Sequence, residues 1–273
     1  MQYHLVLTEK CNLSCSYCGG TRHIQGLPVY PEYSFEDLKD FIAEDTEPVI
    51  GFYGGEPLLN LDLMYKVLDN IPARAYNLQT NATHLSEVKD RYLEKIDTIL
   101  VSIDGDKETT DRCRGEGTYD TIIGNLRDVQ DREYGGDIVA RMAYSINGDI
   151  YQDVKYLLEL RYPEFEHVHW QLDVFWNSLE KWDDFEYWMR RYEKGISLLV
   201  KDWVRGLETG EVIGIVPFIP VAKTLLTGEP VKSIRCGAGI DSFAIMTDGN
   251  IDACPIAPEM PFYHIGNIYE SNP

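Results

Sequence analysis

Three cysteines lie within eight consecutive residues near the start of the chain, at Cys11, Cys15 and Cys18. Their spacing, C-x3-C-x2-C, puts three thiols on one short segment, and cysteine thiolates hold both iron–sulfur clusters and zinc. The preceding residues, MQYHLVLTEK, lack the apolar run and the small-residue cleavage site of a secretory signal, so disulfides are a poor explanation. The three cysteines therefore predict a metal site in a reducing, cytoplasmic setting.

The number of cysteines separates two kinds of metal site. A cubane iron–sulfur cluster takes four ligands, so three cysteines leave one iron open, and an open position is typical of a reactive metal. A structural zinc site needs a fourth ligand, and the segment from Cys11 to Cys18 contains none. The spacing favours an iron–sulfur cluster, with a non-enzymatic zinc-binding interaction module as the alternative.

The first two thirds of the chain alternates β-rich runs with helical patterns. Strands are predicted at 3–8, 49–53, 75–80, 98–103, 138–146 and 167–175, and helices at 34–45, 60–70, 85–95, 118–133 and 151–161. This alternation predicts βαβ units around a parallel sheet, either an open barrel or a doubly wound sheet. A long helical pattern follows at 182–207, and Asp248-Gly249 predicts the turn of a β-hairpin.

Glycine and polar residues follow four of the predicted strands. Cys11 follows the first strand, Gly54-Gly55-Glu56-Pro57 the second, Thr80-Asn81 the third, and Ser102-Ile103-Asp104-Gly105 closes the fourth. The carboxyl ends of parallel strands meet at one edge of the sheet, where α/β proteins bind their ligands. We therefore expect an active site at this edge.

The charge balance narrows the range of partners. The chain of 273 residues carries 45 acidic and 25 basic side chains, a net charge of −20. Nucleic acid and anionic membrane surfaces both attract basic proteins, so neither is an expected partner. The sequence also lacks a stretch of 18 apolar residues that would span a membrane.

These motifs, taken in order, resemble those of the radical S-adenosylmethionine (radical SAM) superfamily. The resemblance covers residues 1 to about 180 and includes the aromatic Tyr17 before the last cysteine of the loop and Arg114 before Gly115–Asp120. It implies a partial (β/α)6 TIM-type barrel, a 4Fe–4S cluster on the three cysteines and S-adenosylmethionine (SAM) as cofactor. It further implies oxidoreductase-type chemistry in an anaerobic setting.

The resemblance also implies roles for residues at the strand ends. Glu56 would accept a hydrogen bond from the methionyl ammonium of SAM, Ser102 and Asp104 would bind the ribose hydroxyls, and Arg114 would pair with the carboxylate. Gly54 and Gly55 would let the backbone approach the ligand closely. The implied cofactor-binding residues lie in the cysteine loop and in the motifs that follow the later strands: Tyr17, Gly54, Gly55, Glu56, Asn81, Ser102, Asp104 and Arg114.

The C-terminal part resembles the opening of the SPASM/twitch extension of radical SAM enzymes that modify peptides and proteins. The matching elements are Cys236–Gly239, Asp248–Ile251, Cys254-Pro255 and Gly266–Ile268. They imply that Cys236 and Cys254 bind an auxiliary 4Fe–4S cluster, and two ordinary buried cysteines are the alternative. The later cysteines of a SPASM region are missing before Pro273, so we expect a C-terminally truncated form or an incomplete cluster.

Together, these inferences predict three regions and one reaction. We expect a radical SAM barrel at 1–180, a bridging helical segment at 181–230, and an incomplete SPASM/twitch-like region with a β-hairpin at 231–273. The expected reaction is reductive cleavage of SAM, followed by hydrogen abstraction from a peptide or protein, with ferredoxin or flavodoxin as electron donor. The same chemistry on a small molecule is the alternative.

Two details of the sequence limit this prediction. Pro255 stands where sulfatase-maturing relatives carry an aspartate, which disfavours formylglycine formation. The sequence identifies no general base, because His167, His169 and Asp173, near the sixth strand, are more typical of structural residues. Cys113 matches no motif and is expected to be structural.

Overall fold

The computed structural model describes residues 1–18, 26–146, 148–173, 184–229, 231, 234–256 and 260–271. The boundaries expected near residues 180 and 230 lie outside these residues. Nine strands form one sheet in the order β6-β5-β4-β3-β2-β1-β7-β8-β9. Their bounds are β1 (Gln2–Val6), β2 (Val49–Tyr53), β3 (Ala75–Thr80), β4 (Thr98–Ser102), β5 (Asp137–Tyr144), β6 (His167–Leu172), β7 (Ser242–Ile245), β8 (Asn250–Asp252) and β9 (His264–Asn267).

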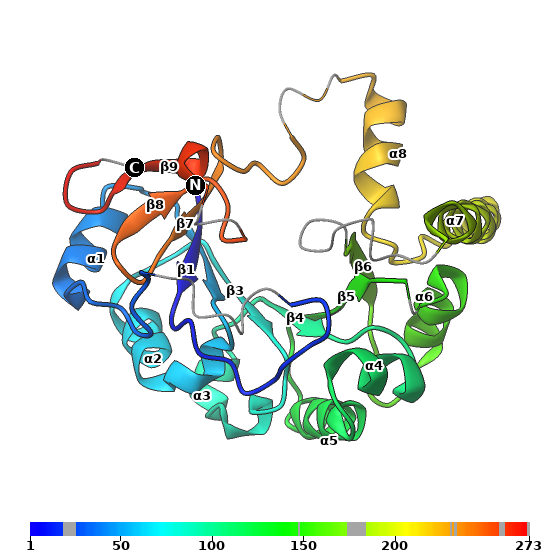
Figure 1. Cartoon of the computed structure of the whole chain (residues 1–273), viewed down its shortest axis with the longest axis horizontal. Helices are drawn as coiled ribbons and strands as arrows, with labels where there is room; N and C mark the ends of the chain where they lie inside the picture. Colours follow the sequence, from blue (N-terminus) through cyan, green and yellow to red (C-terminus); the bar gives the residue numbers. More distant parts are fainter. Residues whose placement is uncertain are drawn as a thin grey trace.

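Strands β1 to β6 confirm the predicted parallel barrel. Each pairs in parallel with the next strand along the chain, so the order never reverses as it does in a doubly wound sheet. The sheet does not close on itself, because β1 has β7 on its other side and β6 meets only an isolated bridge between Val168 and Ile215. Figure 1 shows the curved sheet with β1 and β6 well apart.

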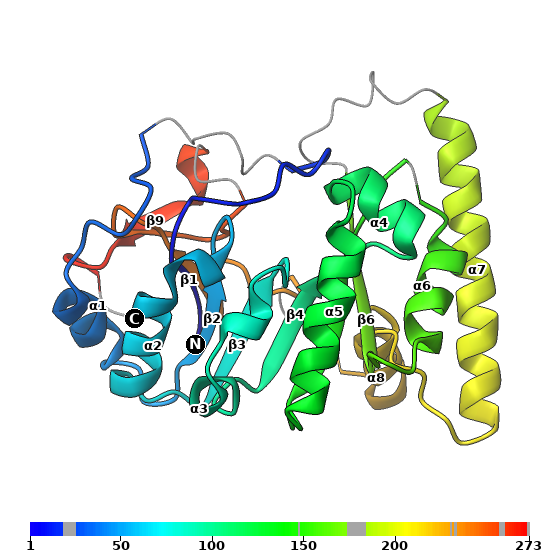
Figure 2. The same ribbon diagram turned by 90° about the horizontal axis from the view of Figure 1, so that it is seen from below.

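Helices cover one face of the parallel strands, as Figures 1 and 2 show for α1 to α6. The helices are α1 (Phe35–Ile42), α2 (Leu61–Asn70), α3 (Asp90–Leu93), α4 (Lys107–Arg114), α5 (Thr118–Asp131), α6 (Ile150–Glu159), α7 (Phe185–Glu208) and α8 (Phe218–Thr227), with short 3-10 turns η1 (Pro57–Asn60), η2 (Leu85–Glu87) and η4 (Pro261–Tyr263). Successive strand side chains point to opposite faces. On β4, for example, Ile99 and Val101 are fully buried in the core beneath the helices.

The opposite face, here called the inner face, carries polar side chains. They alternate with the core residues and are partly exposed: His4, Tyr53, Gln79, Ser102, Arg141 and His169. A closed TIM barrel fills this space with packed branched apolar side chains. The polar inner face is instead suited to hold a ligand.

The C-terminal strands extend the barrel sheet. The predicted hairpin is confirmed: β7 and β8 pair antiparallel across the turn at Asp248-Gly249, where Gly249 has a φ of +87°. The sequence does not indicate that β7 also pairs in parallel with β1, from Gln2 opposite Ser242 to Leu5 opposite Ile245. This pairing attaches the segment containing Cys236 and Cys254 directly to the barrel.

Helix α4 escapes prediction for a physical reason, whereas α8 lies within the bridging helical segment expected at 181–230. Helix α4, KETTDRCR, has Cys113 as its one apolar residue, so no hydrophobic period marks it. Its start is set by Asp106, whose side chain accepts a hydrogen bond from the backbone N–H of Thr109 at 2.9 Å. Helix α8 contains Pro220, which a helix tolerates in its first turn. No helix in the described ranges is long and apolar enough to cross a membrane.

Candidate active site

The cysteine loop leaves β1 alongside the GGEP segment that follows β2. The backbone N–H groups of Gly55 and Glu56 donate to the carbonyls of Thr8 and Lys10, each at 2.8 Å. Gly54 has a φ of +137°, and a Cβ there would lie 2.3 Å from the carbonyl oxygen of Thr8. The two glycines therefore allow the cysteine loop to approach the end of β2 closely. Their expected close approach to a ligand stays a prediction.

Gly54→Ala is therefore expected to lower the free energy of unfolding by about 2–4 kcal/mol, through backbone strain and the clash with Thr8. Gly124→Ala is the matched control, because Gly124 lies inside α5 with no atom within 4 Å of a built Cβ. That control should raise the free energy of unfolding by about 0.5–1 kcal/mol. Urea denaturation measures both, and a Gly54→Ala protein as stable as wild type would contradict the close approach.

Glu56 is buried and fully hydrogen-bonded within the protein. Its side chain is 1% exposed, and it accepts hydrogen bonds from Thr80 Oγ1 at 2.7 Å, the Leu58 N–H at 3.0 Å and the Asn81 N–H at 2.7 Å. Burial raises the pKa of this carboxyl group. Glu56 thereby joins the GGEP segment to the end of β3. Its expected contact with the SAM ammonium stays a prediction.

Asn81 connects the end of β3 to the first half of the cysteine loop. Its Nδ2 donates to Asn12 Oδ1 at 2.9 Å and lies 3.9 Å from the Sγ of Cys11. Asn12 in turn donates through Nδ2 to Thr83 Oγ1 at 2.8 Å. The structure thus brings Asn81 beside the first cysteine, as the strand-end position predicts.

The second half of the loop is held by a buried ion pair at the end of β4. Arg114 donates from Nε and Nη2 to the two carboxylate oxygens of Asp104, at 2.8 and 2.9 Å. The Tyr17 hydroxyl donates to the same carboxylate at 2.6 Å, and the Ala143 N–H donates to it at 2.9 Å. Asp104 and Arg114 are 3% and 7% exposed.

In the structure, the charged groups of Asp104 and Arg114 bind each other and anchor Tyr17. Their expected contacts with the ribose and the carboxylate of SAM stay predictions. The backbone N–H of Ser16 adds a bond to the Cys113 carbonyl at 2.8 Å. Ser102 ends β4 on the inner face and is partly exposed, so its side chain can still make the predicted contact with a ligand.

The three cysteines of the loop form no disulfide, and their thiols are close enough to affect one another's ionisation. The pKa of Cys15 is raised to about 11: burial is the largest cause, Arg114 acts to lower the pKa, and Cys18, Asp104 and Cys11 act to raise it. The pKa of Cys11 is also raised, chiefly by burial and in part by Cys18. Because the pKa values of these thiols are raised, the thiols lose their protons readily only when a bound metal stabilises the thiolates. Their environment therefore suits a bound metal group.

The spacing of the three sulfur atoms does not match a single zinc ion. Two thiolates on one tetrahedral zinc lie about 3.8 Å apart, given Zn–S bonds of about 2.3 Å. The three Sγ atoms are not all within 4.8 Å of one another, although this part of the chain is described. Because a cubane spreads its ligands over separate corners, the donor set fits an iron–sulfur cluster better than zinc.

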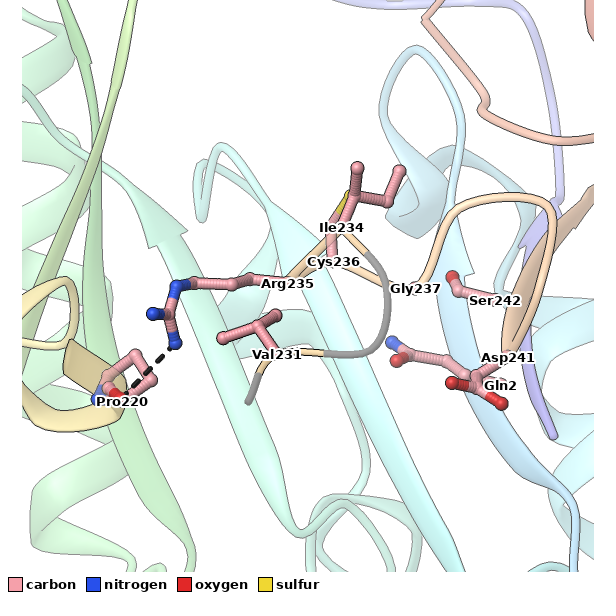
Figure 3. A pocket seen from close by; sticks show the side chains of 9 residues that line it. All are labelled: Gln2, Pro220, Val231, Ile234, Arg235, Cys236, Gly237, Asp241 and Ser242. Atoms are coloured by element: carbon pink, nitrogen blue, oxygen red, sulfur yellow. Dashed lines mark hydrogen bonds between the residues drawn. The ribbon is translucent and has the colours of Figure 1, made fainter. Parts of the chain in front are cut away.

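Cys236 and Cys254 come together at the other end of β1. Burial raises the pKa of Cys254, and the nearby Cys236 raises it further. Cys236 lines a cavity of about 390 Å³ with Gln2 and Ser242, the first residues of β1 and β7 (Figure 3). In this cavity Arg235 turns toward α8 and donates to the Pro220 carbonyl at 3.2 Å. Cys113 is buried beside Ser145, as a structural cysteine would be.

Arg141 and His169 on the inner face are the residues that sequence reasoning underrates. They lie opposite each other on β5 and β6 and are joined by a hydrogen bond between Arg141 Nη1 and His169 Nδ1. The signal for Arg141 is present in the sequence, since it is the one charged residue within the apolar run IVARMAYSI. His167 instead pairs with Asp137 at the opposite ends of these strands.

Comparison with known proteins agrees with this geometry. Residues 5–161 match the model of the radical SAM superfamily. An uncharacterized protein of Archaeoglobus fulgidus is 33% identical over 122 residues, covering 44% of this chain and 29% of that protein. Fe-coproporphyrin III synthase of Methanosarcina barkeri is 28% identical over 162 residues, covering 56% of this chain and 39% of that protein. The chain therefore spans well under half the length of these relatives.

A solved structure of native anSMEcpe, with bound AdoMet and Cp18Cys peptide, has the same fold. It matches 100% of this chain and 79% of its own, with a TM-score of 0.76 and 19% sequence identity. Radical SAM enzymes use a 4Fe–4S cluster and SAM, and the three cysteines of the loop fit such a cluster. Because the family model covers more than half of the sequence, including the cysteine loop, the chain belongs to the radical SAM superfamily.

Proposed function

We propose that this chain binds a 4Fe–4S cluster through Cys11, Cys15 and Cys18, cleaves SAM reductively and modifies a peptide or protein. The observation that carries the proposal is the convergence of three cysteines, none of them in a disulfide, on one loop at the carboxyl ends of the barrel strands. When bound, the cluster and SAM supply one-electron cleavage to methionine and a 5′-deoxyadenosyl radical, which takes a hydrogen atom from the substrate. Ferredoxin or flavodoxin is the proposed electron donor.

The chain's own residues hold this loop in place from two sides. Asn81 and Asn12 join its first half to the end of β3, and Tyr17 joins its second half to Asp104. Both connections use side chains on the barrel, so the loop is fixed relative to the inner face. A fixed geometry matters for radical chemistry because the reactive atom must meet one C–H bond and be shielded from others.

Metal content after anaerobic purification tests the cluster. We expect about four iron and four acid-labile sulfide atoms per chain after reconstitution. Zinc without iron or sulfide would contradict the proposal and support the interaction module.

The auxiliary cluster on Cys236 and Cys254 is a separate proposal. Two thiols supply half of the four ligands that a cubane takes. Iron above about four atoms per chain, lost in Cys236→Ala, would support it. We likewise retain 1–180, 181–230 and 231–273 as the proposed functional regions, with the last forming the incomplete SPASM/twitch-like part.

Two observations support a peptide substrate over a small molecule. The motifs around Cys236 and Cys254 resemble those of peptide-modifying enzymes, and the anSMEcpe structure of the same fold holds a peptide. The relation to Fe-coproporphyrin III synthase favours the small-molecule alternative. A deuterated peptide encoded beside the gene for this chain is the sharpest probe. Deuterium transfer into 5′-deoxyadenosine would support the peptide, and SAM cleavage without transfer from any such peptide would contradict it.

A further inference from the structure

Three residues form a row across the inner face of the barrel. Ser102 on β4 lies opposite Arg141 on β5, which lies opposite His169 on β6. Because each strand's side chains alternate between faces, all three share the face turned away from the helices. The row lies within the barrel, whereas the cysteines lie on a loop beyond the end of β1.

Arg141 lacks a counter-ion within the described residues. No described carboxylate lies within ion-pair distance of it, in contrast with Arg114, whose guanidinium binds Asp104. Burial lowers the pKa of Arg141 to about 10, so it stays charged at neutral pH. Burial and the charge of Arg141 lower the pKa of His169 to about 4, so His169 is neutral. The pair therefore carries one positive charge.

Tyr53 lies within electrostatic reach of both Arg141 and the cysteines. It lies on the inner face of β2, and burial raises the pKa of its hydroxyl to about 12. Arg141 acts on the same hydroxyl to lower its pKa, while Cys254 and Cys18 act to raise it. Tyr53 is thus within electrostatic reach of both Arg141 and Cys18. Arg141 therefore shares the inner face with a tyrosine that both Cys254 and Cys18 influence.

The hydrogen bond to His169 shapes what the pair can bind. Neutral His169 accepts through Nδ1 from Arg141, so its remaining proton is on Nε2. Arg141 has five N–H donors, of which one hydrogen bond uses one. The pair therefore offers several donors and one charge, which is the arrangement that recognises a carboxylate.

We propose that Arg141 and His169 form a subsite that binds a carboxylate of the substrate inside the barrel. The proposal rests on the proposed function, because it assumes that the substrate enters the barrel beside the cysteine loop. The carboxylate of SAM is the other source of this chemistry. The carboxylate of SAM is expected to bind the open iron at the cysteine loop. The positive charge of Arg141 within the barrel would then be available to a carboxylate of the substrate.

N-acetylglycine and its neutral amide, N-acetylglycinamide, are matched probes of this subsite. Both are titrated by calorimetry into the anaerobically reconstituted protein, saturated with SAM so that the SAM site is occupied. Wild type should bind the acid at least about tenfold more tightly than the amide, because only the acid pairs with Arg141. Arg141→Gln should lose this preference, and Arg141→Lys should retain part of it. Arg190→Gln, an arginine 71% exposed on α7, should keep it in full.

The affinity for SAM separates the two sources of the carboxylate. In Arg141→Gln, the dissociation constant for SAM should change less than about threefold, because SAM is held elsewhere. Loss of SAM affinity would assign the charge to SAM and overturn the substrate subsite. Equal affinity of wild type for the acid and the amide would also overturn it. Circular dichroism confirms that each variant is folded.

The outcomes distinguish the subsite from the proposed function. Wild type that never cleaves SAM refutes the proposed function, and the preference for the acid can still be measured. Wild type that cleaves SAM but shows no preference refutes the subsite alone.

Discussion

Cys15→Ala should abolish the formation of 5′-deoxyadenosine from SAM. Cys15 is the middle one of the three proposed cluster ligands, and its thiol lies near those of Cys11 and Cys18. Two cysteines cannot hold a cubane that presents one open iron, so both the cluster and the SAM site are lost. The product is measured by liquid chromatography after anaerobic incubation with dithionite and SAM, together with iron content.

Ser14→Ala is the control for this prediction. Ser14 lies between the same cysteines, its side chain is exposed, and it is no metal ligand. The control should keep both the iron content and 5′-deoxyadenosine formation of wild type. Normal turnover by Cys15→Ala would refute the assignment of the cluster to this loop.

Asp104→Ala should lower the free energy of unfolding by about 3–5 kcal/mol, as expected when one partner of a buried ion pair is removed. The substitution leaves the buried guanidinium of Arg114 without its carboxylate and removes the acceptor of the Tyr17 hydroxyl. It should therefore also loosen the second half of the cysteine loop. Urea denaturation measures the first effect, and the yield of reconstituted cluster measures the second.

An exposed ion pair provides the comparison. Glu186→Ala removes the carboxylate that pairs with Arg190 on α7, where both side chains are more than 70% exposed. Such surface pairs contribute less than about 1 kcal/mol. If Asp104→Ala were as mild as Glu186→Ala, the proposed anchor of the loop would be wrong.

The sequence predicts the barrel and the cysteine loop because their signals are local. Strands separated by helical patterns imply a parallel sheet, and Cys11, Cys15 and Cys18 are close in the chain. The strand-end residues Asn81 and Asp104 were also placed at the correct edge. Local patterns and topology rules suffice for each of these.

The partners of the site residues depend on contacts between distant segments. Glu56 and Asp104 are polar residues at strand ends, and their sequence context does not tell whether they bind a ligand or the protein. Only the folded chain shows that Thr80 and Asn81 donate hydrogen bonds to Glu56, and that Arg114 forms an ion pair with Asp104.

Arg141 is the opposite case, a residue that the sequence does not mark as a binding residue but that the structure makes a candidate. Its position within an apolar strand is visible in the sequence. That no carboxylate of the described part of the chain pairs with it becomes evident only when β4, β5 and β6 are aligned. The pairing of β7 with β1 is hidden in the same way, because about 240 residues separate the two strands.

The most direct test of the central claim is SAM cleavage by the reconstituted wild-type protein. Under anaerobic conditions with dithionite, the account predicts methionine and 5′-deoxyadenosine in equal amounts, dependent on the reductant and on the cluster. A protein that holds its full complement of iron and sulfide and yet forms no 5′-deoxyadenosine would contradict it.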